Sequence, residues 1–401
     1  MAKPGGAACN LDCKYCFYLD KLNLSHSSSG AMMSDSVLEA HVRQHIQAQR
    51  SADVVFTWQG GEPTLLGVEF FEKVVNLQRR HGIGRTILNT FQTNGVLLDD
   101  LWGEFLKRED FLVGISLDGP RPLHDCYRVD KSGTPTFDRV ISGLEVLKRH
   151  GVEFNTLSVV HRTNSKHPVE VYRFLKELGS SYLQFIPLVE RMPDAVGITR
   201  GERVAPPLNF AADNVIDPVV SSCSVEAEDY GQFLTAVFDE WLRKDVGVVF
   251  VQLFDVALGI WMGHPSGLCL FREECGDAVA LERTGDVYSC DHFVHPDFRL
   301  GNLMETSLSD LVRSPRQRLF GRAKAAHLPA YCHSCDVRFA CNGECPKNRF
   351  LQTPDGEFGL NYLCGAYKRF FHHVNPVMRQ MAWLALSGRP PAEIMSLRGE
   401  C

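Results

Sequence analysis

The segment CNLDCKYCFY (residues 9–18) contains three cysteines, Cys9, Cys13 and Cys16, in the spacing C-x3-C-x2-C. Thiolates are soft ligands that favour zinc or iron–sulfur clusters. A [4Fe–4S] cube presents four irons to protein ligands, so three thiolates leave one iron open to a small molecule. A structural zinc site normally combines two separated ligand pairs, which fits three neighbouring cysteines less well. The segment predicts an iron–sulfur site with one open iron, and zinc with a fourth ligand elsewhere stays the alternative.

Length and composition are those of an ordinary globular protein. The 401 residues indicate two or three domains, or one large barrel with an appendage. Apolar residues make up 44% of the chain and charged residues 22%, which is enough apolar material for cores. The net charge of -6 is too small to indicate a nucleic-acid or membrane partner, and we expect neither.

The amino-terminal residues show no charged segment followed by an apolar run, so no signal peptide is visible. The longest apolar runs are well short of a membrane span. We therefore expect a cytoplasmic protein. The cysteine segment begins soon after Met1, and we expect a few native residues to be missing before it.

Cysteine is the informative residue, because the chain has 14. Without an export signal, metal or redox chemistry is favoured over a disulfide framework. Three of the cysteines, Cys126, Cys223 and Cys401, match no ligand spacing, and we expect them to be buried or incidental thiols.

The first half alternates strand-like and helix-like segments. The strand-like segments are short, rich in β-branched and aromatic residues and without clean alternation, as in a parallel sheet buried on both faces. Their starts recur about every 25 to 40 residues, the length of a βαβ unit. With a short first strand before Cys9, this predicts a partial (β/α)6 TIM-like barrel. Strands are predicted over 53–58, 86–93, 111–118, 153–160 and 182–189, and helices over 34–49, 68–81, 136–151 and 229–245. Ser34 or Ser36 is the expected cap of the first helix, and Thr136 and Gly151 are the expected cap and stop of the third.

Chemically useful residues follow these strands. Because active sites of such barrels lie on the loops after the strands, these segments are expected to gather at one rim. They are the cysteine loop after the first strand, QGGEP (59–63) after the second, Asn94 and Gly95 after the third, SLDGP (116–120) at the end of the fourth and PLVE (187–190) at the end of the sixth.

The second half holds eight further cysteines in a regular pattern. Eight thiolates suffice for two fully ligated [4Fe–4S] clusters, although the Cys332-x2-Cys335 pair leaves structural zinc as an alternative. The spacings are C-x9-G-x4-C (Cys275, Gly285, Cys290), C-x2-C-x5-C-x3-C (Cys332, Cys335, Cys341, Cys345) and C-x18-C (to Cys364), with Cys269 upstream. The predicted division is a barrel over 1–227, a connecting helical segment over 228–262 and a cysteine-rich domain with a carboxyl-terminal helix over 263–401.

The first motif, with Tyr15 before its last cysteine, resembles the signature of radical S-adenosylmethionine (SAM) enzymes. The resemblance implies that the open iron chelates SAM and that a deoxyadenosyl radical is released. Gly60 and Gly61 allow a close backbone approach, and Glu62 is able to accept from an ammonium group. The cosubstrate contacts that the resemblance implies are Gln59, Gly60, Gly61, Glu62, Ser116, Arg128 and Val189.

The second cysteine pattern resembles the SPASM extension of radical enzymes that modify peptides. In that family the ligands interleave along the chain, so the chain would carry three [4Fe–4S] clusters in all. The first auxiliary cluster would be held by Cys269, Cys275, Cys290 and Cys345, and the second by Cys332, Cys335, Cys341 and Cys364.

Several segments together resemble anaerobic sulfatase-maturating enzymes, from residue 3 to about residue 396: KPGGAACNLDCKYCFYLDK, FTWQGGEPTLLG, QTNGVLL, GISLDGP, QFIPLVE and LSGRPPAEIM. The resemblance implies oxidation of a Cys or Ser side chain in a client sulfatase to formylglycine. Asp291 would be the base, and Tyr18 and Gln59 would line the substrate cavity. The implied partners are a client peptide of the C/S-x-P-x-R type, entering between the two domains, and an electron donor such as flavodoxin or ferredoxin. We expect a monomer.

Two other functions stay open. Another SPASM-type maturase would form a thioether or a cross-link in its peptide. A zinc-binding adaptor without catalytic activity would hold no iron and cleave no SAM.

Overall fold

The computed structural model describes residues 1–24, 32–208 and 218–398. Its centre is a ten-stranded sheet in the order β10-β9-β8-β1-β2-β3-β4-β5-β6-β7. The strands from β1 to β7 pair in parallel with their neighbours, as the βαβ pattern predicts. The strands are β1 (Ala2–Lys3), β2 (Asp53–Trp58), β3 (Thr86–Thr93), β4 (Phe111–Ser116), β5 (Phe154–Val160), β6 (Tyr182–Pro187), β7 (Phe250–Val251), β8 (Ala280–Glu282), β9 (Asp286–Tyr288) and β10 (Arg299–Asn302).

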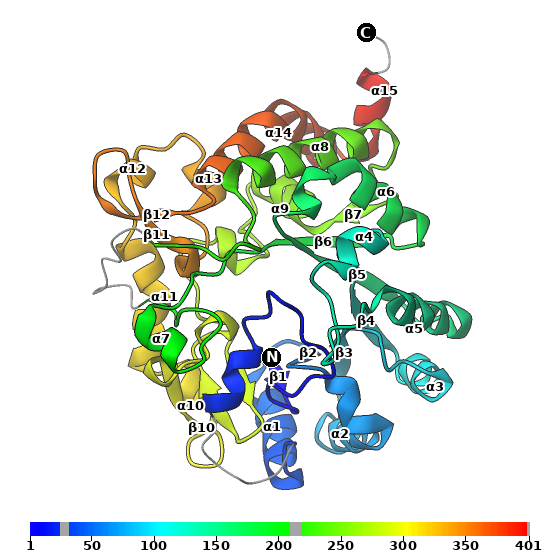
Figure 1. Ribbon diagram of the computed structural model, residues 1–401. Coiled ribbons are helices and arrows are strands. Elements are labelled where there is room, and N and C mark those ends of the chain that lie inside the picture. The colour runs from blue at the N-terminus through cyan, green and yellow to red at the C-terminus, as the bar shows by residue number, and fades with distance from the viewer. Residues whose placement is uncertain (25–31, 209–217, 399–401) are drawn as a thin grey trace.

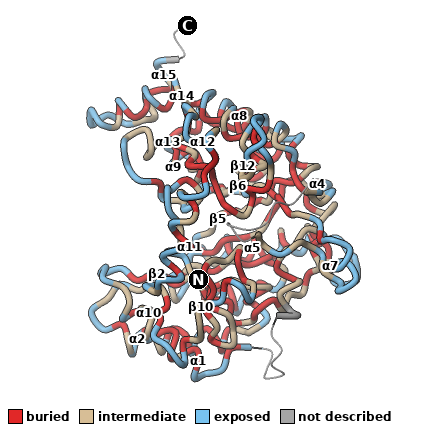
Figure 2. The backbone as a smooth tube through the Cα atoms, turned by 90° about the vertical axis from the view of Figure 1, so that its left-hand side faces the viewer, coloured by how far each residue is buried: buried red, intermediate tan, exposed pale blue. Residues whose placement is uncertain are grey.

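Helices cover the outside of the sheet, in the sequence α1, α2, α3, α5 and α6 around its edge (Figure 1). Figure 2 shows buried positions concentrated inside the molecule and exposed positions along the outer helices. The helices of the first half are α1 (Asp35–Ala48), α2 (Gly67–His81), α3 (Asp100–Arg108), α4 (Arg121–Asp125), α5 (Phe137–His150), α6 (Pro168–Glu177) and α7 (Ala195–Thr199).

The predicted helix caps are partly correct. Ser34 caps α1, with its hydroxyl accepting from the Val37 amide at 3.3 Å. Gly151 ends α5 in the left-handed conformation at φ 64°. Thr136 stands at the start of α5, but its hydroxyl donates to the Arg128 carbonyl at 2.9 Å instead of capping the helix. Asp125 caps α5 in its place, because its carboxylate accepts from the amides of residues 136 and 137.

The carboxyl-terminal part completes the sheet and adds a second, smaller layer. Strand β8 pairs in parallel with β1, and β9 and β10 continue antiparallel from it. A separate antiparallel hairpin joins β11 (Arg349–Gln352) and β12 (Phe358–Asn361). The remaining helices are α8 (Ala227–Lys244), α9 (Gln252–Trp261), α10 (Leu308–Val312), α11 (Pro315–Ala326), α12 (Ala330–His333), α13 (Arg338–Cys341), α14 (Cys364–Leu386) and α15 (Ile394–Arg398).

The fold class predicted from the sequence is confirmed: a parallel sheet with helices outside it and a cysteine-rich second part. The expected bounds of β2 and β3 are exact, and those of the other predicted strands and helices differ by one or two residues at an end. The division of the chain at 227 and 262 remains a prediction. The sheet continues past both positions, through β7 after 227 and β8 after 262. None of the helices in the described part of the chain has the length and apolar character that a membrane span needs.

Candidate active site

The cysteine loop is bound to the rim of the barrel through its backbone. The Asp12 amide donates to the Val129 carbonyl at 2.8 Å. Burial raises the pKa of Cys9 to about 11 and that of Cys13 to about 12, and the thiol of Cys16 adds to both. Buried thiols of this kind ionise when a cation binds them, so the three sulfurs are suited to metal ligation.

Tyr15, the aromatic residue of the motif, fastens the cysteine loop to the end of β4. Its hydroxyl donates to Asp118 Oδ2 at 2.6 Å. Arg128 binds the same buried carboxylate through Nε at 2.9 Å and Nη2 at 3.1 Å, and the Val159 amide donates to it at 2.9 Å. The ion pair with Asp118 uses two of the three guanidinium nitrogens of Arg128, Nε and Nη2. A cosubstrate carboxylate at Arg128 would therefore bind Nη1.

Gly60 and Gly61 let the loop after β2 approach the cysteine loop itself. The amide of Gly61 donates to the Gly6 carbonyl at 2.8 Å, and the amide of Glu62 donates to the Ala8 carbonyl at 2.8 Å. A Cβ atom on Gly61 would lie 2.0 Å from the Ala8 oxygen, and one on Gly60 would lie 2.8 Å from the Gly6 oxygen. These glycines are therefore required for packing beside the cysteines, a reason that the sequence pattern alone did not reveal.

Glu62 is buried and joins the loop after β2 to the end of β3. Its Oε1 accepts from the Thr64 amide at 3.0 Å, the Thr64 hydroxyl at 2.7 Å and the Thr93 hydroxyl at 2.8 Å. Its Oε2 accepts from the Asn94 amide at 2.7 Å. Burial raises the pKa of this carboxyl in spite of the four donors. An ammonium contact, as the resemblance implies, would use Oε2.

The other residues expected to contact the cosubstrate stand at the carboxyl ends of strands. Gln59 follows β2, Ser116 ends β4 and Val189 comes two residues after β6. Gln92 donates to the Ser116 hydroxyl at 3.1 Å, and Lys347 donates to the Val189 carbonyl at 3.1 Å. These residues lie at the rim to which the cysteine loop is bound.

Lys3 connects two of the residues expected to act on the substrate. Its ammonium group lies 2.6 Å from Asp291 Oδ1 and 3.7 Å from the centre of the Tyr18 ring. The Tyr18 hydroxyl donates to the carboxylate of Glu282, and burial raises the pKa of Tyr18 well above its ordinary value. Burial disfavours the charge on Asp291, but Lys3, His292 and the amino terminus together hold the pKa of Asp291 below its ordinary value.

Sequence reasoning missed Lys3 and Glu282. Lys3 lies in the quoted segment KPGG, where it has the pattern of an ordinary surface lysine, yet its side chain is 2% exposed. A buried lysine needs a counter-charge, and the nearest one comes from residue 291. The sequence signal that could have identified Lys3 is a charged residue in a strand close to the cysteine motif. Its partner, Asp291, becomes apparent only in the folded structure.

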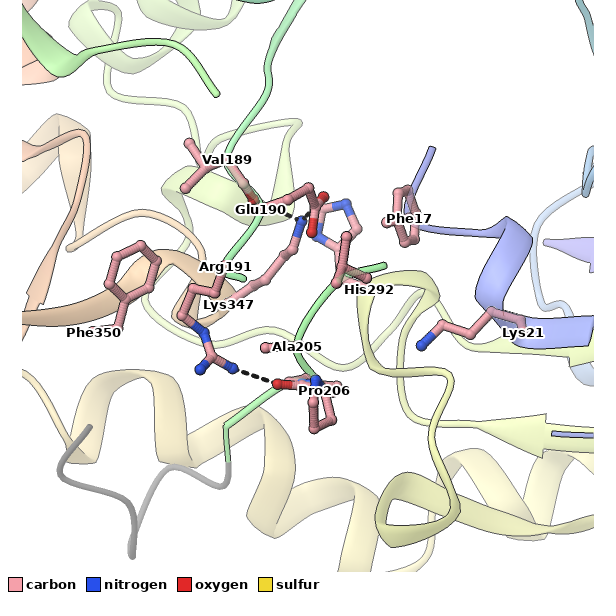
Figure 3. A pocket seen from close by; sticks show the side chains of 12 residues that line it. Phe17, Lys21, Val189, Glu190, Arg191, Ala205, Pro206, His292, Lys347 and Phe350 are labelled. Atoms are coloured by element: carbon pink, nitrogen blue, oxygen red, sulfur yellow. Dashed lines mark hydrogen bonds and ion pairs between the residues drawn. The ribbon is translucent and has the colours of Figure 1, made fainter. Parts of the chain in front are cut away.

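A cavity opens between the cysteine loop, the segment after β6 and the carboxyl-terminal part of the chain (Figure 3). The rings of Phe17 and His292 meet edge to face across it, with centroids 5.9 Å apart. Lys347 forms an ion pair with Glu190 on the adjoining wall, as the dashed line in Figure 3 shows. His292, which lines the cavity, directly follows Asp291 in the chain.

Four of the later cysteines lie together although they are far apart in the sequence. Burial raises the pKa of Cys290 to about 12, and the nearby thiols of Cys269 and Cys275 add to the rise. Burial likewise raises the pKa of Cys345, with contributions from Cys290 and Cys269. The structure thus brings together the set expected for the first auxiliary cluster.

The other four cysteines line one cavity, between α12, α13 and the start of α14. They are Cys332, Cys335, Cys341 and Cys364, the set expected for the second auxiliary cluster. Burial raises the pKa of Cys341 to about 12, and the thiols of Cys364 and Cys332 add to it.

These donor sets fit clusters better than single metal ions. In residues 1–24, 32–208 and 218–398, no three His, Cys, Asp or Glu side chains converge closely enough to hold one ion. The thiolates of an iron–sulfur cluster bind different irons, so they surround a space larger than a single ion. The second cysteine set surrounds its cavity in this way. Of the cysteines without a ligand spacing, Cys126 donates to the Leu123 carbonyl at 3.0 Å, Cys223 is half-buried, and Cys401 lies outside the described residues.

Comparison with known families agrees with this geometry. Residues 4–175 match the radical SAM superfamily, and residues 269–336 match the SPASM iron–sulfur cluster-binding domain. A serine-type anaerobic sulfatase-maturating enzyme of Bacteroides thetaiotaomicron is 45% identical, over 98% of this chain and 94% of its own. A cysteine-type anaerobic sulfatase-maturating enzyme of Clostridium perfringens is 33% identical, over 95% of this chain and 97% of its own.

Solved structures give the same result. Native anSMEcpe with bound AdoMet has a TM-score of 0.80 at 33% identity, covering 95% of this chain and 98% of its own. Native anSMEcpe with bound AdoMet and a Cp18Cys peptide has a TM-score of 0.79 over the same shares. With a radical SAM sheet, a SPASM domain and relatives that match along nearly its whole length, the chain belongs to the anaerobic sulfatase-maturating enzymes.

Proposed function

We propose that this enzyme prefers a serine side chain of a client sulfatase as its substrate and oxidises it to formylglycine. The oxidation of peptidyl Cys or Ser is the reaction of the family. Serine is favoured because a serine-type relative reaches 45% identity, whereas the cysteine-type relatives reach 31 to 33% and two further serine-type relatives 34%. This difference over nearly complete chains is the observation that carries the proposal.

The residues present suit three [4Fe–4S] clusters, one on Cys9, Cys13 and Cys16 and two on the later sets. The first of these, when bound, supplies the electron that cleaves SAM to a deoxyadenosyl radical, and the fully ligated ones accept an electron from the substrate. The protein binds SAM at the rim, with Gln59, Gly60, Gly61, Glu62, Ser116, Arg128 and Val189 as proposed contacts.

Oxidation of the serine Cβ removes one hydrogen atom, one proton and one electron. The deoxyadenosyl radical takes the hydrogen atom. Asp291 takes the hydroxyl proton. Lys3 fixes its carboxylate, the next residue, His292, lines the cavity, and a positioned carboxylate is able to act as a general base. Tyr18 closes the site on the other side of Lys3, and its packed ring keeps water away. Gln59 completes the substrate wall.

The client peptide enters through the cavity between the cysteine loop and the carboxyl-terminal part, with its C/S-x-P-x-R segment extended. We further propose a monomer in the cytoplasm that receives electrons from a flavodoxin or ferredoxin.

The test is an anaerobic assay of the reconstituted enzyme with two peptides that differ only in Ser or Cys at the target position. Formylglycine formation lowers the mass by about 2 Da from Ser and about 18 Da from Cys, as a two-electron oxidation requires. We expect faster turnover of the Ser peptide. Preference for Cys would refute the serine assignment, and a thioether or cross-link product would instead support another SPASM-type maturase.

The Asp291→Asn variant tests the base in the same assay. We expect it to cleave SAM but to form formylglycine about 100-fold more slowly, within the range for removal of a general base. Product formation at the normal rate would contradict the role of Asp291.

A further inference from the structure

Helix α11 carries a basic exposed face in a chain of net charge -6. We define this basic face as Arg316, Arg318, Leu319 and Arg322 of α11 together with Arg313, which lies just before the helix, all of them exposed. No acidic residue occurs between 311 and 327. Leu319, in the middle of the face, is 68% exposed. Arginines around an exposed apolar side chain are typical of protein–protein interfaces.

The charge of the basic face has no counter-charge in ion-pair contact among the residues that the structure describes. Arg316 donates to the backbone carbonyl of Asp297, and Arg318 donates to the Arg313 carbonyl at 2.7 Å. These contacts order the guanidinium groups without cancelling their charge. Within the described residues, none of the four arginines forms an ion pair with a carboxylate.

The opposite face of α11 packs on the cysteines of the first auxiliary set. The Cys275 amide donates to the Gly321 carbonyl at 3.2 Å, and a Cβ atom on Gly321 would lie 2.2 Å from the Cys275 oxygen. Buried Lys324 donates to the carbonyls of Cys269 at 2.7 Å and Leu270 at 2.6 Å. One helix therefore touches this cysteine set with one side and solvent with the other.

We propose that the basic face is the docking surface for an acidic one-electron carrier protein of the flavodoxin class, placed to exchange electrons with the first auxiliary cluster. The proposal rests on the proposed function, which releases one electron from the substrate for every electron used to cleave SAM. The hydroquinone of the carrier gives up one electron and becomes the semiquinone, and that electron would pass through the first auxiliary cluster to the cluster on Cys9, Cys13 and Cys16, where SAM is cleaved. The semiquinone accepts the electron that the substrate releases, so electrons balance over one turnover.

Two features favour a carrier over the client sulfatase. The client segment C/S-x-P-x-R is itself basic, so a face of four arginines repels it. The basic face also lies on the helix that packs against Cys269 and Cys275, so a carrier bound there is separated from the first auxiliary cluster by one helix. No residue of α11 lines the substrate cavity. Charge complementarity of this kind steers association and makes its rate depend on salt.

The test compares two reductants on the reconstituted holoenzyme. The variant is Arg316→Glu, Arg318→Glu, Arg322→Glu, and the control, Lys107→Glu, Lys166→Glu, Arg379→Glu, reverses three other exposed charges. SAM cleavage is measured with a purified bacterial flavodoxin in its hydroquinone form and, separately, with dithionite. We expect the flavodoxin-driven rate of the variant to fall at least about tenfold, in keeping with electrostatic steering, and the control to keep the normal rate. With dithionite all three proteins are expected to react alike and to contain equal iron.

A second measurement uses the unmodified enzyme, so it does not depend on how the variant folds. The flavodoxin-driven rate is expected to fall as salt rises from about 50 to about 300 mM, because screening weakens attraction between exposed charges. A rate independent of salt, or equal flavodoxin-driven rates in variant and control, would overturn the proposal. The proposal would also be overturned if the variant had a raised KM for the client peptide but a normal rate with flavodoxin, because the basic face would then bind the client. If the unmodified enzyme forms no formylglycine with dithionite, the proposed function is refuted. This outcome is distinct from those that refute only the docking surface.

Discussion

Lys3 holds its ammonium group between the Tyr18 ring and the Asp291 carboxylate, two groups separated by more than 270 residues in the chain. A buried ion pair costs desolvation of both partners, and removal of one partner leaves the other charge unpaired. The pair therefore defines where the carboxylate points. Lys3 is a positioning residue, because it acts through Asp291.

We expect Lys3→Met to cleave SAM but to form at least about tenfold less formylglycine per deoxyadenosine, because the base loses its orientation and its charge partner. The measurement is the ratio of the two products at equal iron content. Lys3→Arg, which keeps the charge, is the control and is expected to restore part of the ratio. An unchanged ratio in Lys3→Met would remove Lys3 from the reaction.

Gly61 determines how closely the loop after β2 approaches the cysteine loop. A methyl group there meets the Ala8 oxygen at 2.0 Å, so Gly61→Ala is expected to displace the cysteine loop and to lose about four of about twelve irons per chain. Gly259→Ala in α9 is the matched control, since no atom lies within 4 Å of its added Cβ. Iron analysis and SAM cleavage check both variants, and normal iron in Gly61→Ala would show that the loop adjusts.

At the residue scale, the sequence identified kinds of residue better than their partners. Tyr15 and Glu62 were singled out by their motifs, but their hydrogen bonds to Asp118 and to Thr93 depend on which strand ends lie together. Such partners follow from the register of a sheet, which local patterns do not specify.

At the scale of elements, the end of β4 and the start of α5 meet at His124. This ring is fully buried, with Nδ1 accepting from the Asp118 amide at 3.4 Å and Nε2 donating to the Thr136 hydroxyl at 3.0 Å. Burial lowers the pKa of His124 to about 3, with the Arg128 charge adding to the effect. The neutral form is therefore the folded form.

A histidine whose pKa is lowered by folding stabilises the protein above its unfolded pKa, near 6.5, and loses that contribution as pH falls toward the folded value. Between about pH 7.5 and about pH 5.5, His124 is expected to remove about 1.4 kcal/mol from the free energy of unfolding. Anaerobic thermal unfolding at both pH values, with His124→Gln as control, measures this share. The variant should show a smaller pH dependence, and equal dependence in both proteins would contradict the assignment.

The two cysteine sets connect elements that come from different parts of the chain. Cys290 follows β9 and Cys345 follows α13, yet both are proposed ligands of one cluster, while Cys341, between them in sequence, is a proposed ligand of the other. The interleaving was implied by the family resemblance and could not be obtained from spacing alone, because eight cysteines allow many partitions.

Iron content distinguishes this partition from any other. Cys290→Ala, Cys345→Ala and the double variant are each expected to keep about eight of about twelve irons, since both residues hold the same cluster. Cys341→Ala combined with Cys345→Ala should keep about four. A double Cys290→Ala, Cys345→Ala variant with about four irons would show that the two cysteines belong to different clusters.

At the scale of the whole molecule, the sequence predicted the barrel, the cysteine-rich part and their order. Strand segments between 53 and 187 were recognisable from their β-branched and aromatic residues. They are not buried on both faces as expected, because burial alternates along them: in β2, Val54 and Phe56 are buried and Val55 is exposed. The two-residue strands β1 and β7 are too short for any pattern, and their place in the sheet depends on long-range pairing. The continuation of the sheet through β8 was missed for the same reason.

The pairing of β1 with both β2 and β8 determines the order in which this part of the sheet can form during synthesis. A polypeptide leaves the ribosome amino terminus first, so β2 is available early. Residues 280–282 follow only after more than two thirds of the chain, and Asp291 later still. The strand that carries Lys3 thus acquires its last neighbour and its counter-charge near the end of synthesis. A nascent or prematurely terminated chain has the cysteine loop but lacks Asp291, the proposed proton acceptor, so on this proposal a substrate-competent radical centre forms only when the protein is nearly complete.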